Sequence, residues 1–222
     1  MQPYLFPYLG YFQLIQAVDH FVFYDDVQFI KQGYVNRNRM SFGDFTVPLA
    51  AGPAHDRINE RRIAVGLFPR FRRKWLRSFD LRYAKSPHGA AARAVATSVW
   101  ADPPENAAEL AEASVRAVCK HLALTGTTFG RASELAYDRS AGGQARLLSL
   151  LATLGATEYV NSPNGRALYD PAAFRAAGVR LRFLRPRLIP DDQSAEAYFS
   201  VLHQIAHHGP VALAQPSFAV VV

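Results

Sequence analysis

The chain has 222 residues, of which 50% are hydrophobic and 12% aromatic, and its formal net charge is +7 at pH 7. This composition excludes a disordered chain and provides a sizeable core, so we expect one domain over residues 1–222. The single cysteine, Cys119, excludes an internal disulfide framework and a cysteine-rich zinc site. Since the sequence has no 18-residue apolar run and no basic-then-apolar signal segment, we expect a cytoplasmic protein without membrane insertion.

The positive charge favours an anionic partner, such as a nucleotide, a phosphorylated small molecule or RNA. Most of the basic residues are arginines, however, and a GC-rich coding sequence produces that bias without a functional cause. Charge alone therefore does not assign a partner.

The first 65 residues predict alternating elements. Residues 1–10 contain two Pro-Tyr pairs and a Gly, which predict the end of a strand and a loop, and residues 11–18 predict a short helix. Residues 20–27 predict a strand that begins with a continuous apolar run, as in a strand covered on both faces of a sheet. Further strands are expected over residues 44–50 and 57–65. This order predicts an α/β fold with a parallel or mixed sheet flanked by helices.

The middle of the chain predicts helices. From residue 68, apolar residues recur near a spacing of 3.6 with Arg and Lys between them, until Pro87 ends the pattern. Helices are also expected over residues 90–100 and 105–124, separated by a loop over residues 101–106. We therefore expect a helical insertion at about residues 68–150, between N-terminal and C-terminal α/β parts.

The last third returns to alternating elements. A helix capped by Gly155 precedes a short strand and a turn rich in Asn, Pro and Gly. A second helix, capped by Gly178, precedes another strand, and a final helix stops at Gly209-Pro210.

Two carboxylates, Asp25 and Asp26, follow the apolar part of the strand over residues 20–27. Adjacent strand residues point to opposite faces, so at most one of these carboxylates faces a given pocket. One would hold or deprotonate a substrate amine while the other caps the following turn, and Lys31 would stabilise developing negative charge. The alternative is a turn in which both aspartates only make local hydrogen bonds.

A polar run of alternating Asn and Arg comes next. If it is extended, Asn36 and Asn38 lie on one face, and Arg37 and Arg39 lie on the other. The guanidinium suits phosphate or carboxylate, and the Asn amide offers both a donor and an acceptor, so we assign all four residues to substrate binding. A solvated edge strand is the alternative.

A second polar run follows a strand near the C-terminus. Its Asn-Gly pair tolerates positive φ, so several backbone N–H groups can point at one anion. The run lacks the glycines of a Walker or dinucleotide motif, and an ordinary turn is the alternative. The candidate anion-binding residues are Asn161, Ser162, Asn164, Gly165 and Arg166.

Two other clusters are weaker candidates. The helix from residue 68 carries many basic residues, which form either a phosphate-binding face or its solvated side. His203 and His207 stand at i, i+4 with His208 beside them, but no carboxylate of fitting spacing joins them. We therefore expect no tightly bound metal.

Three segments, QPYLFPYLGYFQLI, FVFYDDVQFIKQGYVNRNRM and YVNSPNGRALY, resemble in this order the WbqC-like protein family. The resemblance covers most of the chain and is most specific in the N-terminal block. By position it singles out Gln2, Pro3, Gly10, Tyr11, Asp25, Asp26, Lys31, Asn36, Arg37, Asn38, Gly165 and Tyr169. We add Tyr4 and assign Gln2, Tyr4, Tyr11 and Tyr169 to substrate binding. Members of the family tend to carry an Asp in the last helix, where this chain has His203.

The family occurs in bacterial gene clusters for O-antigen and other surface polysaccharides, and in some natural-product clusters. It is associated with modified amino sugars and with a suggested transfer of acyl or aminoacyl groups to a sugar amine. The resemblance thus implies a transferase that forms an amide or acyl bond on an amine of a nucleotide-linked amino sugar or similar small anionic intermediate. The acyl donor would be an amino acid activated by ATP, a thioester or a charged tRNA.

Two alternatives stay open. The first is a non-catalytic protein that binds RNA or a carrier-bound intermediate through the basic helix and the aromatic loop. The second is ATP-dependent nucleotidyl transfer, because the opening is similar to the nucleotidyltransferase and pantothenate-synthetase group. The His-x-Gly-His motif of that group is replaced here by Tyr8-Leu9-Gly10-Tyr11.

Overall fold

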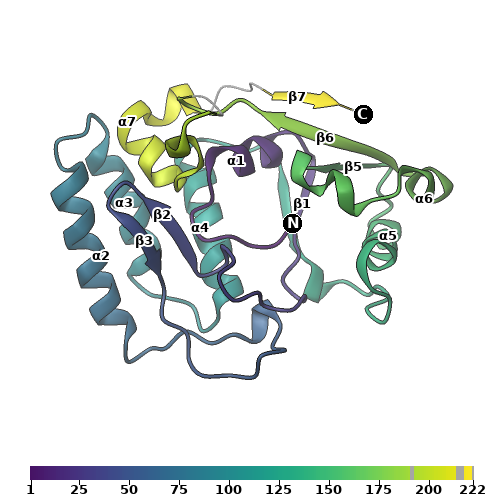
Figure 1. Cartoon of the computed structure of the whole chain (residues 1–222), viewed down its shortest axis with the longest axis horizontal. Helices are drawn as coiled ribbons and strands as arrows, with labels where there is room; N and C mark the ends of the chain where they lie inside the picture. The colour runs from purple at the N-terminus through teal and green to yellow at the C-terminus, as the bar shows by residue number, and fades with distance from the viewer. Residues whose placement is uncertain (191–192, 214–217, 222) are drawn as a thin grey trace.

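The computed structural model describes residues 1–190, 193–213 and 218–221 and confirms the predicted α/β class. The helices are α1 (Leu9–Gln16), α2 (Phe68–Tyr83), α3 (Gly89–Trp100), α4 (Ala107–His121), α5 (Gly143–Thr153), α6 (Pro171–Ala176) and α7 (Val201–Leu213) (Figure 1). The strands are β1 (His20–Phe23), β2 (Arg37–Met40), β3 (Gly43–Thr46), β4 (Thr128–Arg131), β5 (Glu158–Asn161), β6 (Arg180–Pro186) and β7 (Phe218–Val221). Short 3₁₀ turns are η1 (Ile58–Glu60), η2 (Ala132–Glu134), η3 (Pro163–Leu168) and η4 (Ala195–Tyr198).

The described strands form three short sheets. β1 and β4 pair in parallel, β2 and β3 form an antiparallel hairpin, and β6 pairs in parallel with β5 and antiparallel with β7. The region expected as a helical insertion is therefore not helical throughout, because β4 returns to β1. Phe129 of β4 stacks on Phe23 of β1 with ring centroids 5.7 Å apart.

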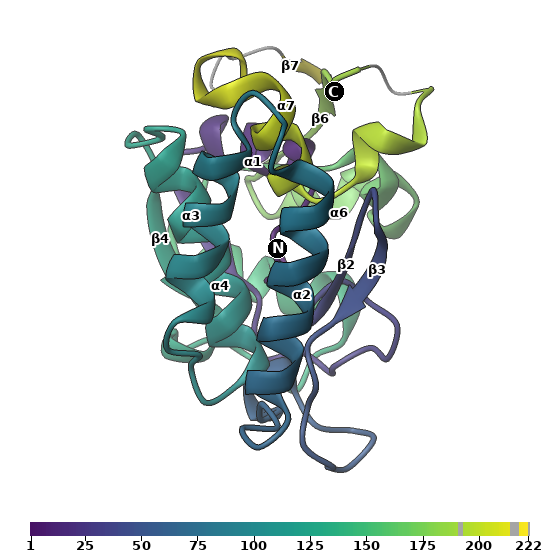
Figure 2. The same cartoon turned by 90° about the vertical axis from the view of Figure 1, so that its left-hand side faces the viewer.

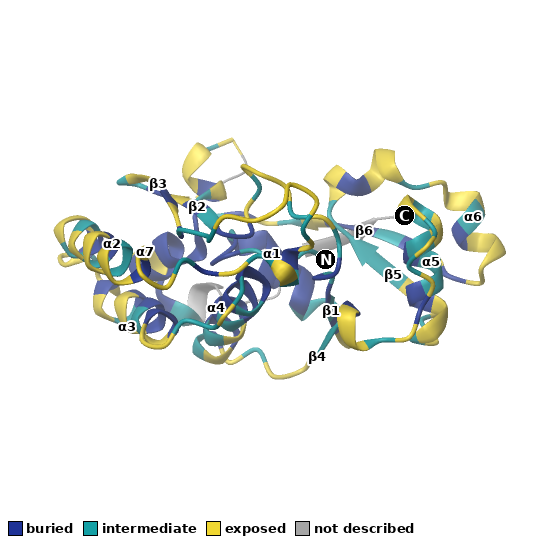
Figure 3. Ribbon diagram, turned by 90° about the horizontal axis from the view of Figure 1, so that it is seen from below, coloured by how far each residue is buried: buried dark blue, intermediate teal, exposed yellow. Residues whose placement is uncertain are grey.

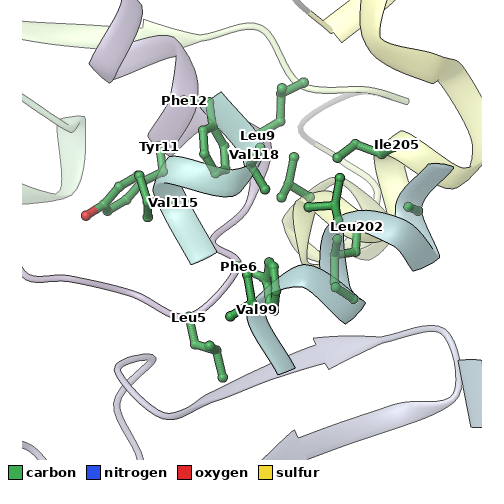
Figure 4. Close-up of a cluster of buried hydrophobic side chains, with 14 of the residues drawn as sticks. Leu5, Phe6, Leu9, Tyr11, Phe12, Val99, Val115, Val118, Leu202 and Ile205 are labelled. Atoms are coloured by element: carbon green, nitrogen blue, oxygen red, sulfur yellow. The ribbon is translucent and has the colours of Figure 1, made fainter. Parts of the chain in front are cut away.

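The main core lies where the N-terminal loop and α1 pack against α3, α4 and α7 (Figure 4). Its labelled side chains are Leu5, Phe6, Leu9, Tyr11, Phe12, Val99, Val115, Val118, Leu202 and Ile205. The aromatic first segment is thus mainly a core element. In the described part of the chain, no helix combines the length and apolarity needed to cross a bilayer.

The N-terminal loop is held in a strained conformation. Phe6 has a φ of 43°, in the left-handed region that residues with a side chain rarely adopt. The Asn38 side chain donates hydrogen bonds to the carbonyls of Leu5 (2.9 Å) and Phe6 (2.7 Å). The Phe6 N–H donates to Ser114 Oγ at 2.8 Å. These contacts, made from β2 and α4, over-determine the loop and maintain its conformation.

Two predicted elements differ in the structure. The strand expected over residues 20–27 ends at Phe23, and the strand expected over residues 57–65 is wrong, because η1 and isolated bridges occupy that stretch. The reason is the loop after β1: the carbonyls of Asp25 and Val27 accept hydrogen bonds from the N–H groups of Asn59 and Ile58. The two segments therefore brace each other instead of continuing as strands.

The final helix contains the predicted break, since Gly209 has a φ of 71° within α7. Before this break, the buried His203 shares a hydrogen bond with Tyr83 Oη at 2.8 Å and lies 3.9 Å from Glu196. Burial and, to a lesser extent, the neighbouring His207, His208 and Arg82 together lower the pKa of His203 to about 4. The residue is therefore neutral in the folded protein at pH 7.

We expect the protein to become less stable as the pH is lowered, because of His203. Between pH 4 and 6.5 the unfolded chain binds a proton at this residue that the folded chain does not bind. The free energy of unfolding should consequently be about 2 kcal/mol lower at pH 5 than at pH 7.5 from this group alone. Urea unfolding of the wild type and His203→Asn at both pH values measures this contribution. The exposed His55→Asn serves as the control, and parallel pH profiles for wild type and His203→Asn would refute the assignment.

Candidate functional site

The carboxylate of Asp26 lies at the centre of a buried polar cluster, with its side chain 1% exposed. It accepts hydrogen bonds from Tyr137 Oη, at 2.8 Å to each oxygen, and from Arg139 Nε at 2.7 Å. Arg146 Nη2 lies 2.9 Å from its other oxygen. Two guanidiniums and a phenol therefore satisfy this carboxylate. Tyr137 and Arg139 come from the segment between η2 and α5, and Arg146 comes from α5 itself.

The same two arginines are fixed by further contacts. Arg139 Nη2 donates to backbone carbonyls of residues 132, 133 and 135, so it closes the turn after η2. Arg146 Nη2 donates to the Asp26 carbonyl at 3.1 Å and to Tyr137 Oη at 3.0 Å. Burial raises the pKa of Tyr137, which keeps the phenol neutral as a donor to Asp26. The cluster acts as a rigid clamp between the end of β1 and α5.

Asp25 is also buried, but its partners are different. Ser133 donates to it twice, from the backbone N–H (3.0 Å) and from the hydroxyl (2.6 Å). The Asn59 amide lies at 3.5 Å, and the Asn59 Oδ1 atom is buried and accepts no hydrogen bond within the described residues. A buried acceptor without a partner requires a donor from elsewhere, such as solvent or a ligand.

An open pocket of about 480 Å³ lies beside Asn59 and Ser133, the two partners of Asp25. It is lined by Asp26, Arg57, Asn59, Ser133, Glu134, Leu135, Ala136 and Arg139. Arg57 is exposed and makes no ion pair in the part of the chain that the structure describes. The pocket therefore combines acceptors on one side with a free guanidinium, a set of groups that suits a ligand with both a donor and an anionic part.

The second predicted segment, residues 161–166, forms the end of β5 and η3. Asn161 donates to Tyr169 Oη at 3.2 Å, and its own oxygen accepts the Ser162 N–H at 2.7 Å. Gly165 packs against this amide, since a Cβ at that position would lie 2.5 Å from Asn161 Nδ2. Asn164 and Arg166 are exposed, and the Arg166 guanidinium lies over the Phe183 ring.

Tyr24 lies beside both polar regions. Burial raises the pKa of Tyr24, Arg146 lowers it, and the charges of Asp26 and Tyr169 raise it. The guanidinium of Arg146 lies 5.4 Å from the centre of the Tyr24 ring. The loop after β5 is therefore a neighbour of the Asp26 cluster, and its predicted role in anion binding stays a prediction.

The Asn and Arg residues of the hairpin face opposite sides, as predicted. Asn36 and Asn38 are buried, and the Asn36 amide donates to the Val47 carbonyl at 2.8 Å. Arg37 and Arg39 both bind Asp44, with Arg37 Nη2 at 3.2 Å and Arg39 Nε at 2.5 Å. Their contacts stabilise the hairpin and the N-terminal loop, and no described hydrogen bond or ion pair joins them to the aspartates of the candidate site.

The other N-terminal candidates lie outside the pocket lining. Lys31 is exposed in the turn before β2, without a described ion pair to Asp25 or Asp26. Tyr11 is buried and donates to the Gln2 carbonyl at 2.9 Å. Tyr4 is partly buried between the Tyr11 and Tyr34 rings. Their predicted catalytic or substrate-binding roles are not tested by these contacts.

Sequence reasoning missed the partners of the two aspartates. These residues are Asn59, Ser133, Tyr137, Arg139 and Arg146. The local signal was the run Tyr-Asp-Arg-Ser-Ala-Gly-Gly before an amphipathic helix, where basic and aromatic residues gather next to a turn. No group of three His, Cys, Asp or Glu side chains able to hold a metal occurs among residues 1–190, 193–213 and 218–221.

Comparison with known proteins agrees with the sequence resemblance. The chain is 29% identical over 181 residues to the uncharacterized protein Rv1507c of Mycobacterium tuberculosis, an alignment that covers 79% of this chain and 76% of the relative. No solved structure matches the chain. The model of the WbqC-like protein family matches residues 2–214, which include the loop, both aspartates and the run after β5. The chain therefore belongs to the WbqC-like protein family.

Proposed function

We propose that this protein is a transferase that forms an amide or related acyl bond on the amine of a nucleotide-linked amino sugar or a similar intermediate of surface-polysaccharide or natural-product biosynthesis. The reacting amine would bind in the pocket beside Asn59 and Ser133, the two hydrogen-bond partners of Asp25, and Arg57 would bind an anionic part of the substrate. Membership of the WbqC-like family supports the context.

One observation carries the proposal: Asn59, whose buried Oδ1 atom has no hydrogen-bond partner among the described residues, lines an open pocket together with Ser133, and its amide nitrogen lies 3.5 Å from Asp25. An amine supplies N–H donors that satisfy such an acceptor. The Ser133 hydroxyl already donates its hydrogen to Asp25, so its lone pairs are available to accept a second N–H. An amine bound in this pocket would therefore have two acceptors available, Asn59 Oδ1 and Ser133 Oγ.

The chemistry follows from this arrangement. The amine nitrogen attacks the carbonyl carbon of the acyl donor, the C–N bond forms, and the leaving group departs with its bonding electron pair. The amine proton passes to Ser133 Oγ while the Ser133 proton passes to Asp25 Oδ2, which lies 2.6 Å away. Asp25 is the base in this scheme, and Asp26 is a positioning residue because two guanidiniums and the Tyr137 phenol already satisfy its carboxylate.

A binding and product assay tests the proposal. A nucleotide-linked amino sugar with a free amine is compared with the same compound carrying an acetylated amine, first by thermal shift. At about a hundred times its dissociation constant the free-amine compound should stabilise the protein by roughly 2.7 kcal/mol. The acetylated compound should bind at least tenfold more weakly, because it offers fewer N–H donors and more bulk.

Mass spectrometry then follows the free-amine compound with ATP and amino acids, with acyl thioesters, and with charged tRNA as donors. Acylation of the amine by one donor class supports the transferase and identifies the second substrate. Equal binding of the two sugars, or stabilisation by RNA alone that disappears with salt, would contradict the proposal.

A further inference from the structure

The positive charge of this protein is concentrated on one helix. Residues 68–85 contain seven of the 25 Lys and Arg residues but only one of the 18 Asp and Glu residues, Asp80. Their net charge of +6 accounts for nearly all of the +7 of the chain. Residues 68–85 therefore carry most of the net positive charge, and the charges of the remaining residues nearly cancel.

The packing of α2 leaves its basic side free. Phe68, Trp75, Phe79 and Tyr83 are buried on one side, where Trp75 contacts the Trp100 ring of α3. The opposite side faces outward at one end of the molecule, as Figures 2 and 3 show. Arg70, Arg73, Lys74 and Arg77 on α2 and Lys85 just after it are exposed and make no ion pair within the described residues. Arg82 is also exposed, but it donates to Ser41 Oγ at 3.0 Å. Asp80, by contrast, is already bound by Arg93 at 2.6 Å.

Apolar side chains lie among these cations. Leu81 is 81% exposed, although it belongs to a regular helix. A shallow depression of about 500 Å³ is lined by Arg73, Leu76, Arg77, Asp80 and Leu81. A surface that combines an exposed leucine, a depression and unpaired arginines has the composition of a protein interface, where Arg and aliphatic anchors carry the binding energy.

We propose that this α2 face (Arg70, Arg73, Lys74, Arg77, Leu81 and Lys85) docks an acidic protein partner that presents carboxylates around an aliphatic side chain. The carboxylates would pair with the free guanidiniums, and the aliphatic side chain would cover Leu81 in the depression. This inference does not depend on the proposed reaction, because the residues of the α2 face do not line the pocket beside Asn59 and Ser133.

Two other anionic partners fit the face less well. RNA binds through phosphates and stacked bases, but the α2 rings turn inward to the core and Leu81 offers no stacking plane. A membrane requires a wide apolar helix face, whereas the depression on α2 has only Leu81 and the half-buried Leu76 among its cations. The exposed Leu81 among these cations is therefore the feature that favours a protein partner over RNA or a membrane.

The test uses a fluorescent helical peptide that carries glutamates around one leucine, with fluorescence anisotropy as the readout on the full chain. Arg73→Glu/Arg77→Glu should weaken binding at least tenfold. The same charge change at two exposed arginines elsewhere, Arg175→Glu/Arg185→Glu, should have less than a threefold effect. Leu81→Ser should weaken binding about tenfold, the loss expected when a buried leucine contact is removed.

A second peptide with serine in place of its leucine completes the test. This peptide should bind weakly to the wild type, and Leu81→Ser should not change its affinity, because no apolar contact remains to be lost. The proposal is overturned if Leu81→Ser leaves the first peptide unaffected, or if the control pair weakens it as much as the α2 pair. Tighter binding of a single-stranded RNA or of anionic phosphatidylglycerol vesicles, unchanged by Leu81→Ser, would likewise overturn it.

Discussion

Replacing Asp26 with alanine is expected to lower the free energy of unfolding by about 3–5 kcal/mol, the cost of removing one partner from a buried ion pair. The variant leaves Arg139 and Arg146 without their counter-charge, and the Arg146 side chain is only 17% exposed. It also removes the acceptor of the Tyr137 hydroxyl. Urea unfolding at pH 7, followed by circular dichroism, measures the loss.

Asp44 provides a matched control. It also binds two arginines, Arg37 and Arg39, but its side chain is 39% exposed. Solvent screens this pair of contacts, so Asp44→Ala should cost less than about 1 kcal/mol. If the two alanine variants lose the same stability, the Asp26 cluster is not the clamp that its burial indicates.

Replacing Asp25 with asparagine is expected to lower turnover by about 10²–10⁴-fold, the range for loss of a general base. The amide keeps the shape of the side chain and still accepts the Ser133 N–H, but it cannot take the proton from the Ser133 hydroxyl. Stability should fall by only about 1–2 kcal/mol, because a charged hydrogen-bond acceptor becomes neutral.

Two measurements separate this chemical effect from a folding defect. Turnover is determined at a temperature where unfolding curves show both proteins fully folded, with the reaction identified by the product assay. Ser133→Ala should lose activity as well, whereas Lys31→Ala should retain it, since Lys31 is exposed and makes no described contact with Asp25 or Ser133. An active Asp25→Asn would remove the base assignment but would leave the proposed substrate class standing.

Much of the fold followed from local patterns. The aromatic stripe of α2 predicted a helix because its apolar residues recur every three to four positions. Phe68, Trp75 and Phe79 of this stripe are buried, and Phe71 and Leu76 are half-buried. Alternation placed the Asn and Arg side chains on opposite faces, and the structure buries Asn38 and exposes Arg39. Glycines at the ends of predicted helices, Gly155 and Gly178, have positive φ as expected of helix caps.

The candidate site was less accessible to sequence reasoning. The position of Asp25 and Asp26 at the end of β1 was apparent, but all of their named partners except Asn59 lie more than 100 residues away in the chain. No periodicity indicates which arginine will neutralise a given aspartate. β4 was missed for a related reason: its four residues carry no strand pattern, and they become a strand by pairing with β1.

The distance along the chain between Asp26 and Arg146 also bears on synthesis by the ribosome. Their contacts span 120 residues, and the Tyr137 and Arg139 contacts span 111 and 113. At typical elongation rates of about 5–20 residues per second, Asp26 would wait on the order of 6–24 s for Arg146 to be made. During that interval the loop after β1 has no clamp, and its two carboxylates remain in water. We therefore expect the pocket to assemble only after α5 has emerged, so a nascent chain stalled before Arg146 should leave Asp26 accessible to carboxyl-modifying reagents.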